Sequence, residues 1–219
     1  MLLYSRAEGN RMLTTPRLIV IALCAALNFS VGTIVYLVKL PIYLDSIGTI
    51  LCALLLATDR KAAFVCAWLA AATSLIVSAL LVNPFVPWFA GTDVAIALVA
   101  AFVIARGATT FRARPLPTYA FAGRVLAYGV LTGLVAAVVS APVVSYLFGG
   151  VTGSGSAVIV ALFLKGGQRV LSAALLSGLT AEPIDKTLQV LLAALLYRAT
   201  PGELIALLQP PLASAAEMR

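Results

Sequence analysis

Polar side chains interrupt an apolar run near residue 45, where Asp45 and Ser46 lie in the sequence LPIYLDSIGT. An aspartate at the centre of a membrane helix costs about 3 kcal/mol, and less near the lipid headgroups. Such a residue therefore reaches the headgroups, pairs with another group or faces a wet cavity. Two interpretations of Asp45 and Ser46 stay open. They cap the helix that follows, or they contact a substrate at the mouth of an outer cavity.

Three further groups of polar residues are candidates for the same cavity. Asp93 either contacts the substrate or caps a helix, and capping is the favoured interpretation. Asn83 and Trp88 lie in NPFVPWF, which predicts an aromatic belt at the membrane interface or, alternatively, a lid that stacks on an aromatic ligand. Thr152 and Ser154 lie in GGVTGSGS, either a plain flexible loop or a turn whose backbone N–H groups follow a ligand or an anion.

A second glycine-containing break, KGGQR, separates two apolar pieces later in the chain. Its Lys165, Gln168 and Arg169 either extend their polar ends outward or point at an anionic group in the cavity. The flanking pieces, 157–164 and 170–181, are each too short to cross a bilayer alone. We expect two half-buried helices or a re-entrant pair here, and a continuous seventh span is the less favoured alternative.

The composition requires a membrane. Of the 219 residues, 62% are hydrophobic and 11% are charged, and the mean hydropathy is +1.07, whereas a soluble domain carries about a quarter charged residues. The alternating strands of about ten residues that are typical of outer-membrane barrels do not occur. Helices must therefore satisfy the backbone in lipid. The predicted fold class is an all-α integral membrane protein.

Six transmembrane helices are predicted from the apolar runs, with a helical or re-entrant insertion between helices 5 and 6. A span needs about 20 residues, and the candidate spans are 18–38, 41–58, 62–82, 92–105, 125–148 and 184–197. Pro142 is expected to kink the fifth helix and Pro183 to lie in the first turn of the sixth. Residues 1–200 then form one transmembrane domain, and 201–219 form a cytoplasmic tail.

Basic residues predict the orientation. With six spans, eleven basic residues fall on one side of the membrane, and four fall on the other, namely Lys39, Lys165, Arg169 and Lys186. The positive-inside rule places the eleven in the cytoplasm together with both termini. The polar groups described above then meet at the outer face.

Several classes of function lack the residues that they need. The chain has no histidine, and its three cysteines lie singly in apolar segments, so we expect no metal site, no haem and no histidine base. The net charge is +7, and the basic residues that cause it lie between the apolar runs, which they orient in the membrane. They do not alternate with aromatic residues in the pattern that is typical of nucleic-acid binding. Phosphate-binding and nucleophile-elbow motifs do not occur either. We therefore predict no enzyme, and active transport would need energy from a partner or an ion gradient.

Four blocks of sequence keep a fixed order along the chain: LPIYLDSIGT at 40–49, the turn at 83–92, GGVTGSGS at 149–156 and EPIDK at 182–186. Together they resemble one set of substrate-binding S components of energy-coupling factor (ECF) transporters, over nearly the whole chain up to Tyr197. The resemblance implies a six-helix protein of the cell membrane that captures a vitamin or similar micronutrient at the outer face. It also implies partners, namely a transmembrane coupling subunit and two ATPases.

The resemblance also gives a role to Ala22 and Ala26. Small residues four apart let helix backbones approach closely, and in the family an alanine-x-x-x-alanine pattern in the first helix meets the coupling subunit. Two departures leave the ligand open. The insertion at 157–181 is longer than in the best-known vitamin binders, and no residue set diagnostic of riboflavin, thiamine, biotin or folate is present. Absence of histidine argues against nickel and cobalt.

Three hypotheses therefore follow from the sequence. The first is a substrate-capturing subunit whose glycine-serine loop at 149–156 becomes ordered when ligand binds. The second is a membrane-embedded ligand sensor or scaffold for a cytoplasmic partner. The third is a small intramembrane enzyme, which the missing acid-base set weakens.

Overall fold

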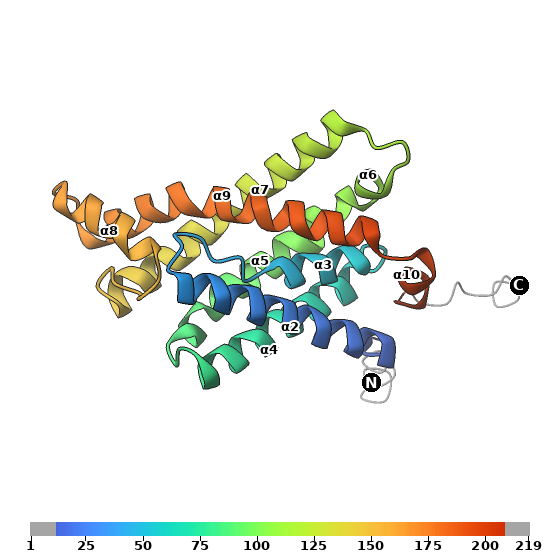
Figure 1. Cartoon of the computed structure of the whole chain (residues 1–219), viewed down its shortest axis with the longest axis horizontal. Helices are drawn as coiled ribbons and strands as arrows, with labels where there is room; N and C mark the ends of the chain where they lie inside the picture. The colour runs from blue at the N-terminus through green and yellow to red at the C-terminus, as the bar shows by residue number, and fades with distance from the viewer. Residues whose placement is uncertain (1–11, 209–219) are drawn as a thin grey trace, which may run out of the picture.

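The computed structural model describes residues 12–208, and every regular element in that range is helical (Figure 1). One candidate membrane span is α9 (Val170–Ala199), which is long and apolar enough to cross a membrane only if it is counted together with α10 (Gly202–Leu208), a helix bent away from it by 102°. Four other helical units are long and apolar enough to cross a membrane: α2 (Thr15–Val38), α4 (Arg60–Leu81), Val86–Arg112 and Thr118–Leu147. The chain is a multi-pass membrane protein by these lengths.

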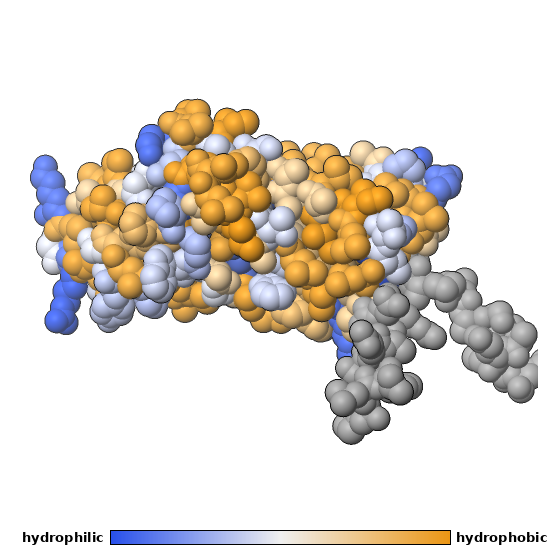
Figure 2. All heavy atoms as spheres, turned by 90° about the horizontal axis from the view of Figure 1, so that it is seen from below, coloured by the Kyte–Doolittle hydropathy of each residue, from blue (hydrophilic) through white to orange (hydrophobic). Residues whose placement is uncertain are grey.

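Apolar side chains cover most of the surface between hydrophilic groups at the two ends of the molecule (Figure 2). Leu23, Leu37 and Leu80 are among the large hydrophobic residues that the fold leaves exposed. Contact of such a large apolar surface with water is unfavourable, whereas lipid tails are as apolar as these side chains. The outside of the helix bundle is therefore suited to lipid.

The second predicted span differs from the structure. Residues 39–46 are not helical, and α3 (Ile47–Leu55) has nine residues. Lys39 and Leu44 have left-handed backbones, with φ of 58° and 51°, which a regular helix cannot contain. Eight residues of α3 are buried, among α2, α4, α5 and α9, so this short helix occupies the middle of the bundle.

The insertion between helices 5 and 6 also differs from the prediction. Only its first apolar piece is a separate helix, α8 (Ser156–Lys165). The second piece runs directly into the 30-residue α9, so Pro183 lies inside that helix and not in its first turn. In the sequence, the polar residues near 182–186 separate two apolar runs, which therefore look like two helices although they belong to one. The expectation of two half-buried helices is therefore wrong.

The remaining spans agree with the prediction in place and differ in their ends. The fourth consists of a 3₁₀ turn (Val86–Phe89) and α5 (Ala90–Phe102), and a further short turn leads to α6 (Ala108–Arg112). The fifth, α7 (Thr118–Pro142), begins seven residues earlier than expected. It passes into a π-helical turn directly after Pro142, where the proline removes a backbone donor.

Figure 1 shows that α2 begins and α9 ends at the same end of the bundle. Most of the described basic residues belong to the helix ends and turns found there. Arg112 and Arg198 each donate hydrogen bonds to backbone carbonyls beside the other residue. Arg17 donates to the Leu208 carbonyl of α10 at 2.9 Å and lies 3.7 Å from Asp59. Eight of the eleven residues assigned to the cytoplasm lie at this end, and the other three are outside the described residues. Of the predicted tail, 202–208 form α10 and 209–219 are likewise not described.

Candidate functional site

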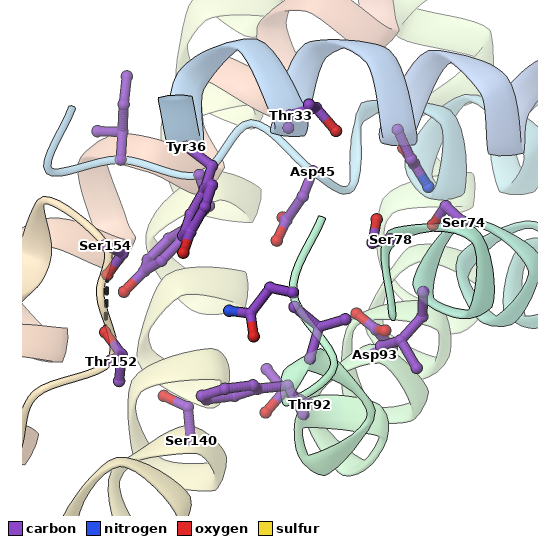
Figure 3. Close-up of a pocket in the computed structure, with 18 of the residues that line it drawn as sticks. Thr33, Tyr36, Asp45, Ser74, Ser78, Thr92, Asp93, Ser140, Thr152 and Ser154 are labelled. Carbon is purple, nitrogen blue, oxygen red and sulfur yellow. Dashed lines mark hydrogen bonds between the residues drawn. The ribbon is translucent and has the colours of Figure 1, made fainter. Parts of the chain in front are cut away.

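A pocket with a volume of about 180 Å³ lies between the helix ends that are remote from the basic end (Figure 3). It is surrounded by the C-terminal halves of α2 and α4, the start of α5, the end of α7, the connection at 40–45, the glycine-serine loop and the middle of α9. Figure 3 shows Asp45 pointing into it from the side of α2, with Asp93 across the space. Its polar lining includes Thr33, Tyr36, Tyr43, Ser74, Ser78, Thr92, Ser140, Glu182 and Lys186.

A buried group of polar and charged residues on α9 borders this pocket, and two of them, Glu182 and Lys186, line it. Glu182, Asp185, Lys186 and Gln189 follow one another at helical spacing, which places them on one face of the helix. The ammonium of Lys186 lies 2.7 Å from the Asp185 carboxylate and 3.5 Å from that of Glu182. Its side chain is 3% exposed and that of Asp185 is fully buried. Buried charges persist only when paired and hydrogen-bonded, and the pair of Lys186 and Asp185 meets that condition.

Asp185 also holds the non-helical connection in place. The backbone N–H groups of Tyr43 and Leu44 donate to its Oδ1 at 3.0 and 2.9 Å. The amide of Gln189 donates to its Oδ2 at 2.7 Å, while the Gln189 carbonyl oxygen accepts from the Ser46 N–H at 3.0 Å. These bonds replace those that a helix would have given the connection. The polar face of α9 therefore shapes the pocket wall opposite it.

Asp45 lies on the pocket wall, and neither Asp45 nor Ser46 caps α3. The Asp45 carboxylate is 3.4 Å from Lys186 and half exposed, and it accepts the Ser46 hydroxyl at 3.0 Å. Ser46 occupies the N-cap position without a side-chain capping bond. Asn28 of α2 instead accepts the Gly48 N–H and donates to the Thr49 hydroxyl at 2.9 Å. Capping comes from the neighbouring helix, so that interpretation of Asp45 and Ser46 is wrong.

Asp93 faces the pocket without a capping role. It lies in the first turn of α5, whose N-cap residue is Phe89, and the structure gives it no capping hydrogen bond. No basic side chain of the described residues forms an ion pair with it. Next to it, the hydroxyl of Thr92 is buried and has no hydrogen-bond partner. The favoured prediction of capping is therefore wrong for Asp93.

The glycine-serine loop contributes a chain of hydroxyl groups. The Thr152 and Ser154 hydroxyls lie 2.8 Å apart, and Ser154 is 2.8 Å from Ser156, whose hydroxyl is 2.6 Å from that of Tyr43. Lys39 donates to the Gly153 carbonyl at 2.7 Å. Gly153 has φ of 74°, a conformation that glycine adopts without strain. The loop is thus held against the pocket, and its further ordering by ligand stays a prediction.

Five of the predicted substrate contacts are not on the pocket wall. Ser46 is buried behind Asp45, and Trp88 is 58% exposed on the outside. Lys165 is the last residue of α8, Gln168 and Arg169 follow it, and all three are exposed. That helix of ten residues extends about 15 Å, which takes them away from the loop that they follow. The other five predicted contacts, Asp45, Asn83, Asp93, Thr152 and Ser154, line the pocket.

Two charged lining residues, Glu182 and Lys186, were not predicted as contacts. The sequence had placed the start of the last helix at 184, so Glu182 counted as a loop residue and Lys186 as an outer basic residue. A signal was present, because three ionisable residues in EPIDK lie inside an otherwise apolar run. Ionisable residues within membrane segments face the interior and mark functional sites by default.

Replacing Thr92 by valine is expected to leave the free energy of unfolding unchanged or to raise it by up to about 1 kcal/mol. Valine keeps the shape and removes a buried hydroxyl that has no partner, which ends a desolvation penalty. Thr132→Val is the matched control, because the Thr132 hydroxyl donates to the Tyr128 carbonyl at 2.6 Å. Thermal unfolding in detergent compares the two. If Thr92→Val destabilises as much as the control, its hydroxyl has a structural partner.

Small residues separate inward-facing from outward-facing helix surfaces. A Cβ on Gly133 of α7 would lie 2.5 Å from the Pro183 backbone, and one on Gly129 would overlap Thr187, so this pair packs α7 onto α9. Ala22 and Ala26 of α2 are exposed instead. They form a small-residue strip on the outside of the bundle.

Within residues 12–208, no group of three or more histidine, cysteine, aspartate or glutamate side chains could hold a metal ion. The three cysteines are buried and form no disulfide bond.

Comparison of the chain with protein-family models, with curated proteins and with solved structures found no match.

Proposed function

We propose that this chain is the substrate-capturing membrane subunit of an uptake transporter, similar to the S components of ECF transporters. The observation that carries the proposal is the pocket, which is lined by polar groups that the protein itself leaves partly unpaired. A purely structural polar group in a membrane protein is satisfied by the protein. Groups such as the Thr92 hydroxyl and the Asp93 carboxylate are suited to satisfaction by a ligand.

The location of the pocket supports capture from outside. Basic residues concentrate at the opposite end of the bundle, and such concentrations face the cytoplasm. In this orientation the glycine-serine loop and the connection at 39–46 face the exterior. Both termini then lie in the cytoplasm, and the membrane is the cell membrane.

We propose six membrane crossings, one of which is irregular. Five are the units already described, and the sixth consists of the connection at 39–46 followed by α3. Non-helical backbone at membrane depth is tolerated where it is buried in protein or lines a cavity. The connection at 39–46 fits this condition, because Asp185 and Gln189 accept its N–H groups and it borders the pocket.

Binding is a better account of this pocket than turnover. Chemistry would require a nucleophile beside a base, or an acid and a base poised across a reacting bond. The lysine at the pocket is paired with Asp185, and the chain of hydroxyl groups runs from Thr152 to Tyr43 without a base among its members. We therefore propose no enzymatic activity.

The strip formed by Ala22 and Ala26 is the proposed contact for the coupling subunit. Replacing both alanines by leucine is expected to reduce the amount of coupling subunit and ATPases that co-purify by at least about tenfold, since bulk at a close helix contact prevents approach. Ala127→Leu on the exposed face of α7 is the control. Affinity purification in mild detergent with protein mass spectrometry measures the loss.

The outcomes of that purification separate the candidates. ATPases and a membrane subunit with the wild type, and not with the double variant, agree with the proposal. Equal recovery with both proteins contradicts the role of the strip. Recovery of a cytoplasmic kinase without ATPases contradicts uptake and favours the ligand sensor.

A further inference from the structure

We infer that the ligand of the pocket is a small organic cation, such as a protonated amine or a cationic heterocycle with about one ring. This inference rests on the proposed function and specifies its substrate class. It follows from the charges on the pocket wall, from buried polar atoms that lack partners, and from the aromatic side chains beside them.

The pocket carries more negative than positive charge. Its wall includes the carboxylates of Asp45, Asp93 and Glu182 and a single ammonium, that of Lys186, among the described residues. This ammonium is closest to Asp185, at 2.7 Å, so its charge is already shared with a carboxylate outside the lining. With all groups ionised and Asp185 included, four carboxylates face one ammonium, which leaves a surplus of three negative charges.

No other basic side chain of the described part offsets that surplus. Lys39, the first residue of the connection, is exposed, donates to the Gly153 carbonyl at 2.7 Å and lies over the Tyr36 ring. Lys165 at the C-terminal end of α8 and Arg169 after it are exposed, and the other described basic residues are at the basic end. An anionic ligand would therefore find no unshared cation on the pocket wall, and each ionised carboxylate would repel it in a site of low dielectric.

Two buried polar atoms at the pocket have no hydrogen-bond partner, the Thr92 hydroxyl and Glu182 Oε2. Thr92 is 8% exposed and Glu182 is 6% exposed, and both line the pocket. Glu182 Oε2 has only the ammonium of Lys186 at 3.5 Å. A ligand with N–H donors would satisfy the carboxylate oxygen and could donate to the hydroxyl as well, because a hydroxyl accepts and donates.

The lining favours an organic cation over a metal ion. The carboxylates come from α5, α9 and the connection, and within the described range no three acidic groups are close enough to hold a metal. Tyr36, Tyr43 and Phe89 also line the pocket, and aromatic faces attract organic cations. Its volume of about 180 Å³ is near that of cavities of about 150 Å³ that hold one aromatic ring.

The test uses small molecules extracted from the source cells and separated by ion exchange into cationic, neutral and anionic fractions. Each fraction is added to the purified full-length protein, and the shift in thermal unfolding is measured. Bound molecules are then identified by mass spectrometry. We expect the cationic fraction to raise the unfolding temperature and to yield one bound species.

Carboxylate variants test the site of binding. Asp93→Asn and Glu182→Gln are each expected to weaken affinity for the identified species by about tenfold or more, because each removes a charge-assisted hydrogen bond. Glu203→Gln is the control, since Glu203 is exposed on α10. Unfolding temperatures without ligand show whether a variant is folded.

The outcomes distinguish this inference from the proposed function. Binding from the neutral or anionic fraction alone overturns the cationic class and leaves capture standing. A cation that binds equally to wild type, Asp93→Asn and Glu182→Gln overturns the assignment to this pocket. No binding from any fraction contradicts capture itself, and the inference fails with it.

Discussion

Replacing Lys186 by methionine is expected to lower the free energy of unfolding by about 3–5 kcal/mol, the range for breaking a buried ion pair by removing one partner. The change leaves the fully buried Asp185 without its cation, together with Glu182 and Asp45. Whole domains are stable by only about 5–15 kcal/mol. The variant should therefore unfold at a much lower temperature in detergent, or fail to accumulate.

Two matched variants interpret that result. Lys165→Met removes an exposed lysine and should change stability by less than about 0.5 kcal/mol. Lys186→Met combined with Asp185→Asn should recover much of the loss, because asparagine can still accept the N–H groups of Tyr43 and Leu44. If Lys186→Met is as stable as Lys165→Met, the charged face of α9 does not hold the connection.

Replacing Gly48 by alanine is expected to destabilise the fold by about 3 kcal/mol, at the upper end of the range for overpacking. A Cβ on Gly48 would overlap the Cys24 carbonyl oxygen and its backbone neighbours. Backbone atoms in a packed helix cannot rotate away, so α2 and α3 would have to separate. That movement would also break the hydrogen bond from the Gly48 N–H to Asn28.

Gly123→Ala serves as the control for this prediction. A Cβ on Gly123 would meet nothing within 4 Å, and alanine within a helix is more stable than glycine by roughly 0.5–1 kcal/mol. The unfolding temperature should therefore fall for Gly48→Ala and rise slightly for Gly123→Ala. Equal unfolding temperatures for the two variants would disprove the close crossing of α2 and α3.

The long apolar helices could be predicted because their signal is local. A run such as 18–38 is hydrophobic on every face, and lipid requires such a run to be helical. The positions of α2 and α4 were accordingly predicted within three residues at their ends. The basic end follows from the same local counting.

The connection at 39–46 and the course of α9 could not be predicted in this way. Asp185 accepts a hydrogen bond from the Tyr43 N–H although it lies 142 residues further along the chain. A sequence window of about 20 residues, the length of a membrane span, cannot include both partners. From the sequence alone, Pro41 is a plausible first residue of a helix, and Glu182 is a plausible point for a helix to end. Tertiary hydrogen bonds to Asp185 and Gln189 overrode the local preference in the connection, and α9 continues through Pro183 as one helix.

The candidate site was predicted in part for the same reason. Asp45, Asp93 and Ser154 are polar residues at helix ends, which places them near one face once the spans are counted, and all three line the pocket. Lys165 does not line the pocket, because it lies at the far end of the ten-residue α8. Lys186 was missed because its role depends on partners brought together by folding.

Labelling from outside the cell tests most directly whether the pocket faces the exterior. Ser154→Cys lines the pocket, Glu203→Cys lies at the basic end, and the three native cysteines are buried, which keeps the background low. A membrane-impermeant maleimide added to intact cells is predicted to label Ser154→Cys, and to label Glu203→Cys only after permeabilisation. Labelling of Ser154→Cys only after permeabilisation would contradict capture from outside.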